Sequence, residues 1–405
     1  MRLKGLFCLV LAFCLMMCGC GSAAKTQSES TEDTYMVGMW LSYLELDRML
    51  EQNFKESFKK AVENCSSLGV TDLFVHVRPF CDSLYPSKYF PMRQSAEHID
   101  YDILQYMTEI THAAKMRIHA WINPYRVKTK DENIDSLDEA SIVKKWLTDE
   151  DKTNDKNICF YNGIYLNPTS NDAQKLVIDG IREILEKYNV DGIHFDDYFY
   201  PTDTEIFDAT QYAEYVAECE QPLSREEWRR ANVSQLISGV YTAVKFFDKN
   251  LVFSISPAAS ISKNYGQLFA DVELWMKNGI VDLIIPQLYF GFEYPQAEFC
   301  FDNLIEEWNS LKRAKNVNMA IGLGAYKLNQ AEIIDSEEWC STPDIIAKQT
   351  RLCRETKGIN GHIYYSYTSL FGGLNDNALN HLFKSEVKYI EKNKSDNEKN
   401  NPINK

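Results

Sequence analysis

The sequence lacks the residue patterns that usually hold metal ions. Its seven histidines include no pair spaced H-x-x-x-H, and no two of its cysteines are spaced C-x-x-C. Zinc sites are commonly built on such spacings. We therefore expect neither a bound metal nor another cofactor.

Cysteines beyond the first twenty residues are too few and too scattered for a disulfide framework. Seven remain, at positions Cys65, Cys81, Cys159, Cys219, Cys300, Cys340 and Cys353. Their odd number and wide spacing argue against a small disulfide-stabilised scaffold, while a single disulfide stays open.

Two further classes of protein are disfavoured. No G-x-G-x-x-G follows the first expected strand, so an open sheet that binds a dinucleotide is a weak alternative. The chain has 43 Lys and Arg against 58 Asp and Glu, and its net charge of −15 opposes binding to nucleic acid.

The N-terminal residues resemble a bacterial export signal. Arg2 and Lys4 precede an apolar run, 6–17, that suits a signal peptide and is shorter than the ~20 residues of a membrane-spanning helix. The run leads into Gly19-Cys20, a small residue before a cysteine, as in the lipobox cut by signal peptidase II. We predict that Cys20 is lipidated and anchors the protein to the membrane; the alternative is an ordinary secretory signal. Either signal places the protein outside the cytoplasm, on the outer face of the cytoplasmic membrane or in the periplasm.

Composition divides the chain into four parts. Residues 1–19 form the signal peptide, and 20–34, rich in Ser, Thr and Glu, form a flexible tether. Residues 35–385 form one folded domain, and the Lys-, Asn- and Glu-rich segment 386–405 is expected to be a disordered charged tail.

From residue 36 onward, short apolar runs alternate with amphipathic segments, a pattern typical of parallel β/α units. The expected strands are 36–42, 72–78, 117–123, 192–198, 251–256, 283–289, 319–325 and 361–367. The expected helices are 53–67, 100–115, 172–188, 225–248, 267–278, 296–313 and 344–357, and Ser224 with Glu227 forms a capping box for the fourth. Eight strand candidates in this alternation predict an α/β fold, a closed (β/α)8 (TIM) barrel in a single domain.

Nearly every expected strand begins apolar and ends on a side chain with chemical capability. Such residues include Arg78, Asn123, Tyr125, Arg126, Ser256, Pro286, Gln287, Tyr289 and Tyr365. The carboxyl ends of barrel strands meet at one rim, where the active sites of barrel enzymes lie. The sequence therefore predicts a functional site at this rim.

The segment 191–201, D-G-I-H-F-D-D-Y-F-Y-P, has an informative alternation. Ile193 and Phe195 share one face of the strand, whereas His194 and Asp196 share the other. If the apolar pair packs outward against helices, His194 and Asp196 point into the barrel.

Asp196 and Asp197 are the predicted catalytic residues, because carboxyl groups at a barrel rim suit acid–base or nucleophilic chemistry. Structural alternatives stay open: Asp196 bonded to loop N–H groups or paired with Arg78, Asp197 as a helix N-cap, and His194 as a hydrogen-bonding support. A second carboxyl must act beside Asp196, and besides Asp197 the candidates are Asp82, Asp271 and Glu293.

Aromatic side chains near the strand ends offer flat surfaces for sugar rings. They are Trp40, Trp121, Tyr125, Tyr198, Phe199, Tyr200, Tyr289, Phe290, Phe292, Tyr326 and Tyr367. With the Asn, Gln and Arg residues among them, they indicate a carbohydrate cleft. Arg229 and Asn232 either face the substrate or lie on a solvated helix face.

Seven motifs follow one another in order over about residues 35–375. They are V-H-V-R-P-F-C-D-S-L-Y-P-S (75–87), H-A-W-I-N-P-Y-R (119–126), D-G-I-H-F-D-D-Y-F-Y-P (191–201), W-R-R-A-N-V (228–233), S-I-S-P (254–257), D-L-I-I-P-Q-L-Y (282–289) and I-Y-Y-S-Y (363–367). In these motifs the chain resembles the family-10-like glycosyl hydrolases, a family of bacterial lipoproteins and exported enzymes.

The resemblance implies a (β/α)8 barrel with glycoside hydrolase activity, and cleavage of peptidoglycan strands without stem peptides in some members. Carried over by position, Asp196 and Asp197 are the catalytic pair. The implied substrate-binding residues are Arg78, Asp82, Asn123, Tyr125, Arg126, His194, Tyr198, Gln287 and Tyr289. The Asp-Gly-x-x-x-Asp spacing is also similar to the nucleophile strand of the α-amylase clan, which favours Asp196 as nucleophile. The chain departs from its relatives at 257–260 (P-A-A-S), where they carry a glycine and an aromatic residue, and this implies an altered subsite.

The favoured hypothesis is a lipid-anchored glycoside hydrolase whose partners are a cell-envelope glycan and the membrane. The alternative is a lipid-anchored carbohydrate-binding protein on a barrel that has lost catalysis. Such a protein is expected to lose its strand-end carboxyls, but both are present. A deacetylase-like metalloenzyme needs ligand clusters that the sequence lacks.

Overall fold

The computed structural model describes residues 35–399. The predicted signal peptide, the lipidation site Cys20, the tether and residues 400–405 lie outside the described residues.

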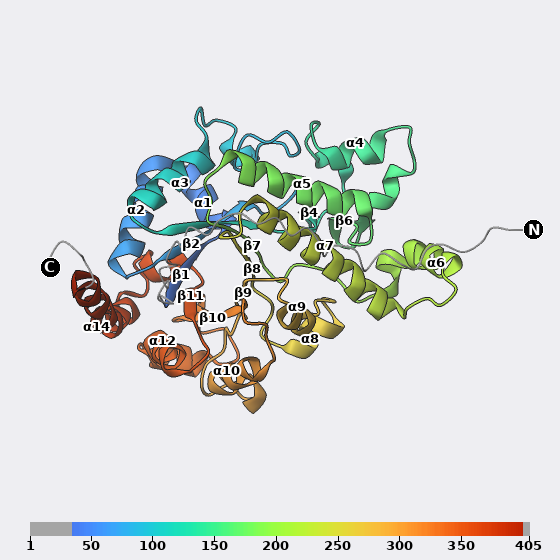
Figure 1. Cartoon of the computed structure of the whole chain (residues 1–405). Helices are drawn as coiled ribbons and strands as arrows, with labels where there is room; N and C mark the ends of the chain where they lie inside the picture. The colour runs from blue at the N-terminus through green and yellow to red at the C-terminus, as the bar shows by residue number, and fades with distance from the viewer. Residues whose placement is uncertain (1–34, 400–405) are drawn as a thin grey trace, which may run out of the picture. The chain divides into compact units, whose positions relative to one another are not determined.

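Eight parallel strands close into a barrel in the order β1-β2-β3-β7-β8-β9-β10-β11 (Figure 1). Their bounds are β1 Met36–Leu41, β2 Asp72–Arg78, β3 Arg117–Ile122, β7 Gly192–Phe195, β8 Val252–Ile255, β9 Leu283–Ile284, β10 Asn318–Leu323 and β11 Gly361–Tyr364. The barrel closes where β11 pairs with β1, with Gly361 opposite Met36. The predicted (β/α)8 barrel is confirmed, and each expected strand is present.

Helices follow the strands and pack on the outside of the barrel, as predicted. They are α2 Phe54–Ser67, α3 Ile103–Ala113, α5 Asn171–Lys187, α7 Arg225–Phe247, α9 Val272–Asn278, α10 Phe301–Ser310 and α12 Ile345–Glu355. The expected capping box of α7 is present, because Ser224 Oγ accepts from Glu227 N while the Glu227 carboxylate accepts from Ser224 N. Seven helices were not predicted: α1 Tyr43–Leu50, α4 Ile142–Thr148, α6 Ala209–Glu218, α8 Ile261–Gly266, α11 Ser336–Ser341, α13 Tyr367–Phe371 and α14 Asp376–Lys399.

The two faces of the barrel wall carry different side chains, as the alternation in β7 predicts. Ile193 and Phe195 belong to the large hydrophobic core between strands and helices. His194 points into the barrel, where its ring lies 4.9 Å from that of Phe74. Gly192 leaves the room that this interior needs, because a Cβ there would lie 2.5 Å from Nδ1 of His119.

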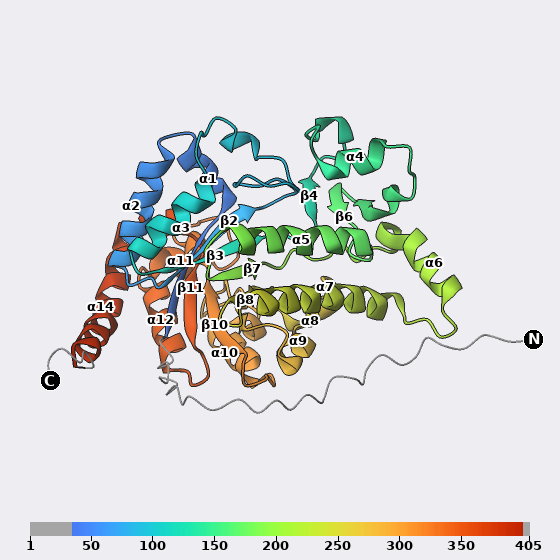
Figure 2. The same ribbon diagram turned by 45° about the horizontal axis from the view of Figure 1, so that its top comes forward.

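A small antiparallel sheet is inserted between β3 and α5 and was not predicted. Its strands are β4 Arg126–Thr129, β5 Ile158–Phe160 and β6 Gly163–Leu166, in the order β4-β6-β5. The same insertion contains α4 Ile142–Thr148, and Figure 2 shows α4, β4 and β6 grouped apart from the barrel strands. Its strands are three or four residues long, too short for a clear alternation in the sequence.

The C-terminal helix continues past the expected domain end at residue 385. Residues 386–399, expected to be disordered, belong to α14. Leu382 is fully buried, and the carboxylate of Glu386 pairs with Arg354 of α12. The helix therefore has an anchored face that the charged composition of the tail conceals.

No helix of residues 35–399 is long and apolar enough to cross a membrane. All seven cysteines of this part of the chain are unpaired thiols.

Candidate active site

A hollow of about 250 Å³ opens among residues at the carboxyl ends of the barrel strands. Its lining is Trp40, Trp121, Asp196, Asp197, Tyr198, Ser256, Gln287, Tyr289, Tyr326 and Tyr365. These residues end the strands or follow them closely, so the parallel barrel brings together side chains far apart in the sequence.

Asp196 follows β7 directly and is almost fully buried, with 2 % of its surface exposed. Its Oδ2 accepts a hydrogen bond from Trp121 Nε1 at 3.2 Å, and its Oδ1 accepts one from Tyr198 N at 3.1 Å. Burial raises the pKa of Asp196, and the negative charge of Asp197 raises it further. The positive charge of Arg126 opposes these effects only in part. Asp196 therefore tends to keep its proton at neutral pH.

Asp197 lies in the loop after β7 and is half-buried. Its Oδ1 accepts a hydrogen bond from Gln287 Nε2 at 3.4 Å. Burial raises the pKa of Asp197, while the Gln287 hydrogen bond and the charges of Lys263 and Arg126 act against the rise. Asp197 is not a helix N-cap, because the next helical turn is Glu205–Asp208.

His194 lies inside the barrel, next to residues that line the hollow. Its Nε2 accepts a hydrogen bond from Trp40 Nε1 at 3.0 Å, and its Nδ1 lies 2.9 Å from Ser254 Oγ. Burial holds the pKa of His194 well below its usual value, so the ring is neutral. Since Nε2 accepts, Nδ1 carries the proton and donates to Ser254. His194 thus orients Trp40, and its geometry is that of the hydrogen-bonding support among the alternatives.

Arg126 and Tyr198 form one edge of the site. Arg126 belongs to β4 of the inserted sheet, and its guanidinium carbon lies 3.3 Å from the centre of the Tyr198 ring. Tyr198 lines the hollow and is 46 % exposed. The insertion therefore supplies a cation beside the two carboxyls.

The opposite wall of the hollow is aromatic. The rings of Tyr289 and Tyr365 stack at 5.8 Å, and Tyr326 meets both edge-on. Gln287 lies beside them and donates to the carbonyl oxygen of Ser256 at 2.9 Å. Flat rings next to fixed polar groups suit the faces and hydroxyls of a sugar.

The structure does not bring Arg78 to the hollow. The pairing of β2 with β3 shifts register between His76 and Arg78, so Arg78 leaves the alternation that would point it inward. Its guanidinium carbon lies 4.3 Å from the centre of the Phe90 ring, and a Cβ on Gly180 would lie 2.6 Å from its Nη1. Arg78 therefore packs under α5, which corrects its predicted place in the lining and leaves out the alternative in which it pairs with Asp196.

Arg126 and His194 adjoin the hollow without lining it, whereas Asp82, Asn123 and Tyr125, also predicted to line it, lie elsewhere. Asp82 accepts a hydrogen bond from Arg93 Nη1 at 2.6 Å and lines a separate hollow of about 550 Å³ beside the inserted sheet. Asn123 Nδ2 donates to the Pro79 carbonyl at 3.2 Å, and Tyr125 is fully buried in the hydrophobic core. Each follows a strand, where the loop path rather than strand alternation sets the direction of the side chain.

A wider groove of about 870 Å³ adjoins the hollow and shares Asp197, Gln287, Tyr289 and Tyr326 with it. Its further lining is Asp203, Ala258, Ala259, Ser260, Ser262, Lys263, Gly266, Gln267, Phe290, Phe299 and Lys327. The segment 257–260, for which the sequence predicts an altered subsite, contributes three of these residues. Sequence reasoning missed Lys263 and Asp203, which belong to no motif and no strand end.

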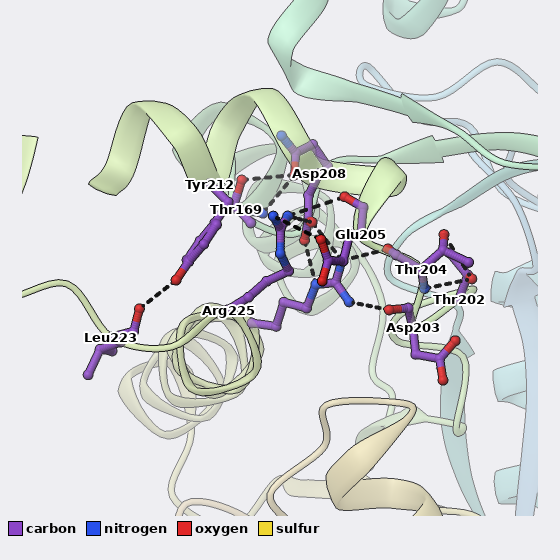
Figure 3. A network of polar contacts seen from close by, with 11 residues as sticks. Thr169, Thr202, Asp203, Thr204, Glu205, Asp208, Tyr212, Leu223 and Arg225 are labelled. Carbon is purple, nitrogen blue, oxygen red and sulfur yellow. Dashed lines mark hydrogen bonds and ion pairs between the residues drawn. The ribbon is translucent and has the colours of Figure 1, made fainter. Parts of the chain in front are cut away.

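Arg229 does not face the hollow. Its Nε and Nη2 donate to the two carboxylate oxygens of Asp208 at 2.7 and 2.6 Å, and it also donates to the carbonyls of Asp203 and Thr204. Figure 3 labels Asp203, Thr204 and Asp208, which accept these hydrogen bonds, and shows Arg225 beside Asp208. Arg229 thus holds the loop after β7 in place from inside the protein. It neither faces the substrate nor lies on a solvated helix face, which were the two alternatives for it. Asn232 donates to the Trp228 carbonyl within the same helix.

The other candidate carboxyls lie elsewhere. Asp271 caps α9 by accepting from Leu274 N, and Glu293 is exposed outside both the hollow and the groove. Within residues 35–399, no group of three or more His, Cys, Asp or Glu side chains is arranged to hold a metal ion.

The closed parallel barrel, with a hollow at the carboxyl ends of its strands, defines a (β/α)8 barrel. The family described as glycosyl hydrolase-like 10 matches residues 35–341, and the chain belongs to this family.

Two curated relatives extend the match. Glycosyl hydrolase YngK of Bacillus subtilis is 28 % identical over 342 residues, which cover 78 % of this chain and 64 % of YngK, less than two thirds of its length. Glycosyl hydrolase DigH of Escherichia coli K12 is 26 % identical over 421 residues, covering 88 % of this chain and 91 % of DigH.

Solved structures share the fold at low sequence identity. The PgaB (BpsB) glycoside hydrolase domain from Bordetella bronchiseptica superposes with a TM-score of 0.56 at 12 % identity, over 86 % of this chain and 98 % of that domain. Alpha-L-fucosidase isoenzyme 2 from Paenibacillus thiaminolyticus gives 0.54 at 12 % identity, over 88 % of this chain and 49 % of that protein. At this identity the likeness concerns the fold alone.

Proposed function

We propose that this protein is an exported, lipid-anchored glycoside hydrolase that cleaves O-glycosidic bonds of a cell-envelope polysaccharide. The observation that carries the proposal is the carboxyl pair Asp196–Asp197, one buried and one half-buried, beside aromatic rings at the mouth of the barrel. Burying two carboxyls side by side is unfavourable for folding, and such sites are common where protons are transferred.

In this proposal Asp196 is the general acid and protonates the leaving glycosidic oxygen. Its raised pKa supports this role, and the hydrogen bonds from the Trp121 and Tyr198 N–H groups hold the carboxyl in place and stabilise the anion left after proton transfer. Asp197 is the ionised partner that stabilises or attacks the developing positive charge at the anomeric carbon. The strand motif favours Asp196 as the nucleophile, but a carboxyl that keeps its proton is better suited to be the acid.

The proposed substrate is the glycan strand of peptidoglycan after removal of its stem peptides. Membership of a glycosyl hydrolase-like family supports the reaction class, and the export signal with Cys20 supports an envelope location. Lipidation would hold the enzyme on the outer face of the cytoplasmic membrane or in the periplasm, beside such strands.

The test is product analysis on purified glycan strands with and without stem peptides. We expect new reducing ends and shorter saccharides from the stripped strands. Binding without any cleavage would instead indicate a carbohydrate-binding protein on a barrel that has lost catalysis.

The anchor is tested separately. Cys20→Ala is expected to leave turnover unchanged and to move the protein from the membrane fraction to the soluble fraction. Full retention of the variant in the membrane fraction would instead point to an uncleaved N-terminal anchor.

A further inference from the structure

The groove beside the hollow has two chemically different walls. One wall is aromatic and consists of Tyr289, Phe290, Phe299 and Tyr326. The other is polar and consists of Ser260, Ser262, Lys263 and Gln267, on α8 and the turns around it. A sugar ring can stack on the first wall and turn its substituents toward the second.

The two lysines of the groove differ in how their charge is compensated. Lys327 Nζ lies 3.4 Å from both carboxylate oxygens of Asp335. Lys263 is exposed, and its Nζ forms no hydrogen bond or ion pair with another residue of 35–399. Lys263 is therefore the lysine of this groove with an ammonium group available to a ligand.

The same groove contains two carboxyls, Asp197 and Asp203. These carboxylates would repel an anionic ligand. The positive charge of Lys263, which lines the same groove and acts to lower the pKa of Asp197, is positioned to offset that repulsion. A neutral glycan would need no such cation.

We infer that this groove is a subsite for a sugar that bears a free carboxylate, and that Lys263 binds that carboxylate. The inference rests on the proposed function and makes it more specific. In peptidoglycan the stem peptide is joined by an amide to the lactyl carboxyl of the muramic acid residue. Removing the peptide restores a free carboxylate, so Lys263 would select stripped strands over intact ones by charge.

The experiment compares two substrates with one backbone: stripped glycan strands, and the same strands with their carboxyls chemically reduced to alcohols. Wild-type protein is measured beside Lys263→Gln, Lys263→Arg and Lys277→Gln, the last removing an exposed lysine of α9 outside the groove. For Lys263→Gln we expect about a ten-fold rise in KM on the carboxylated strands and little change in kcat. On reduced strands Lys263→Gln should have the same KM as the wild type. Lys263→Arg should keep most of the preference for carboxylated over reduced strands. Lys277→Gln should behave as the wild type on both substrates.

Equal effects of Lys263→Gln on both substrates, or no effect on either, would overturn the inference. A shift of the pH–rate profile on both substrates without a KM difference would also overturn it, because Lys263 would then act through the charge of Asp197. Cleavage of either substrate by the wild type supports the proposed function. Only the ratio of the KM values for the two substrates tests the role of Lys263. Failure of the wild type on both would remove the proposed function and this inference together.

Discussion

Asp196 and Asp208 are two buried carboxyls in the chain that follows β7, and their hydrogen-bond partners differ in charge. Asp208 has no exposed surface, and it meets the guanidinium of Arg229 with both oxygens and that of Arg225 with one. Asp196 is 2 % exposed and accepts only from an indole and a backbone N–H. Its neighbour in the chain is a second carboxyl, not a cation.

The difference separates a carboxyl held by ion pairs from one that has no ion-pair partner. A buried carboxylate that is matched by an arginine stays ionised and holds its surroundings in place. A buried carboxyl without such a match keeps its proton and is available to donate it. Burial alone therefore does not mark a candidate proton donor, whereas burial without an ion-pair partner supports the role proposed for Asp196.

The largest expected effect is on turnover. Asp196→Asn removes the transferable proton without changing the size of the side chain, so kcat should fall by about 10²–10⁴-fold. Glu293→Gln, which alters an exposed carboxyl outside both the hollow and the groove, is the control and should retain activity. Hydrolysis assays with circular dichroism of each variant provide the measurement, and unchanged turnover in folded Asp196→Asn would remove Asp196 from the mechanism.

The ion pair between Arg229 and Asp208 is expected to contribute to the free energy of unfolding. Arg229→Ala leaves the buried Asp208 without its bidentate partner, so the free energy of unfolding should fall by about 3–5 kcal/mol. Arg225→Ala, whose side chain is 18 % exposed and which leaves Arg229 in place, should cost about 1 kcal/mol. Urea unfolding measures both, and equal losses would contradict the distinction between them.

Asp196→Asn should also stabilise the protein at alkaline pH. Because the folded-state pKa of Asp196 is raised to about 8, its contribution to stability is complete below pH ~4 and is lost as pH rises through about 8. Asparagine does not titrate, so the variant should gain about 1–2 kcal/mol over the wild type by pH 9. Thermal unfolding at pH 5, 7 and 9 measures the gap, and a gap that narrows with rising pH would contradict the assignment.

The smallest expected effect concerns the pH–rate profile. Activity should fall on the alkaline side as Asp196 loses its proton near pH 8, and on the acid side as Asp197 gains one. Trp121→Phe removes a hydrogen bond that favours the ionised form of Asp196, so the alkaline limb should move up by about half a unit. A downward shift would show that Trp121 does not donate to the carboxylate.

Several structural features were accessible from the sequence because they depend on local patterns. Period-two alternation in 192–196 places His194 and Asp196 inside the barrel, and Ile193 and Phe195 are indeed packed outside. Strand ends rich in polar residues predict where side chains meet, because parallel strands share one rim. Asp196, Gln287 and Tyr289 lie together there.

Other features depend on contacts between distant segments. Arg78 lies outside the predicted lining because the pairing of β2 with β3 shifts register, and the alternation within one strand does not reveal such a shift. Arg126 reached the site on an inserted sheet whose strands are too short to recognise. Lys263 belongs to no motif, and only the tertiary structure places it, on α8, in the same groove as Asp197.

The sequence by itself determined the barrel, the direction of Asp196 and the family, because apolar periodicity and ordered motifs are properties of the chain alone. Only the tertiary structure decided which carboxyl has a counter-charge. Asp208 and Arg229 are twenty-one positions apart, and Asp196 and Trp121 are seventy-five apart. The protonation of a buried acid is set by neighbours that folding brings within a few ångströms, and no local pattern in the chain encodes that distance.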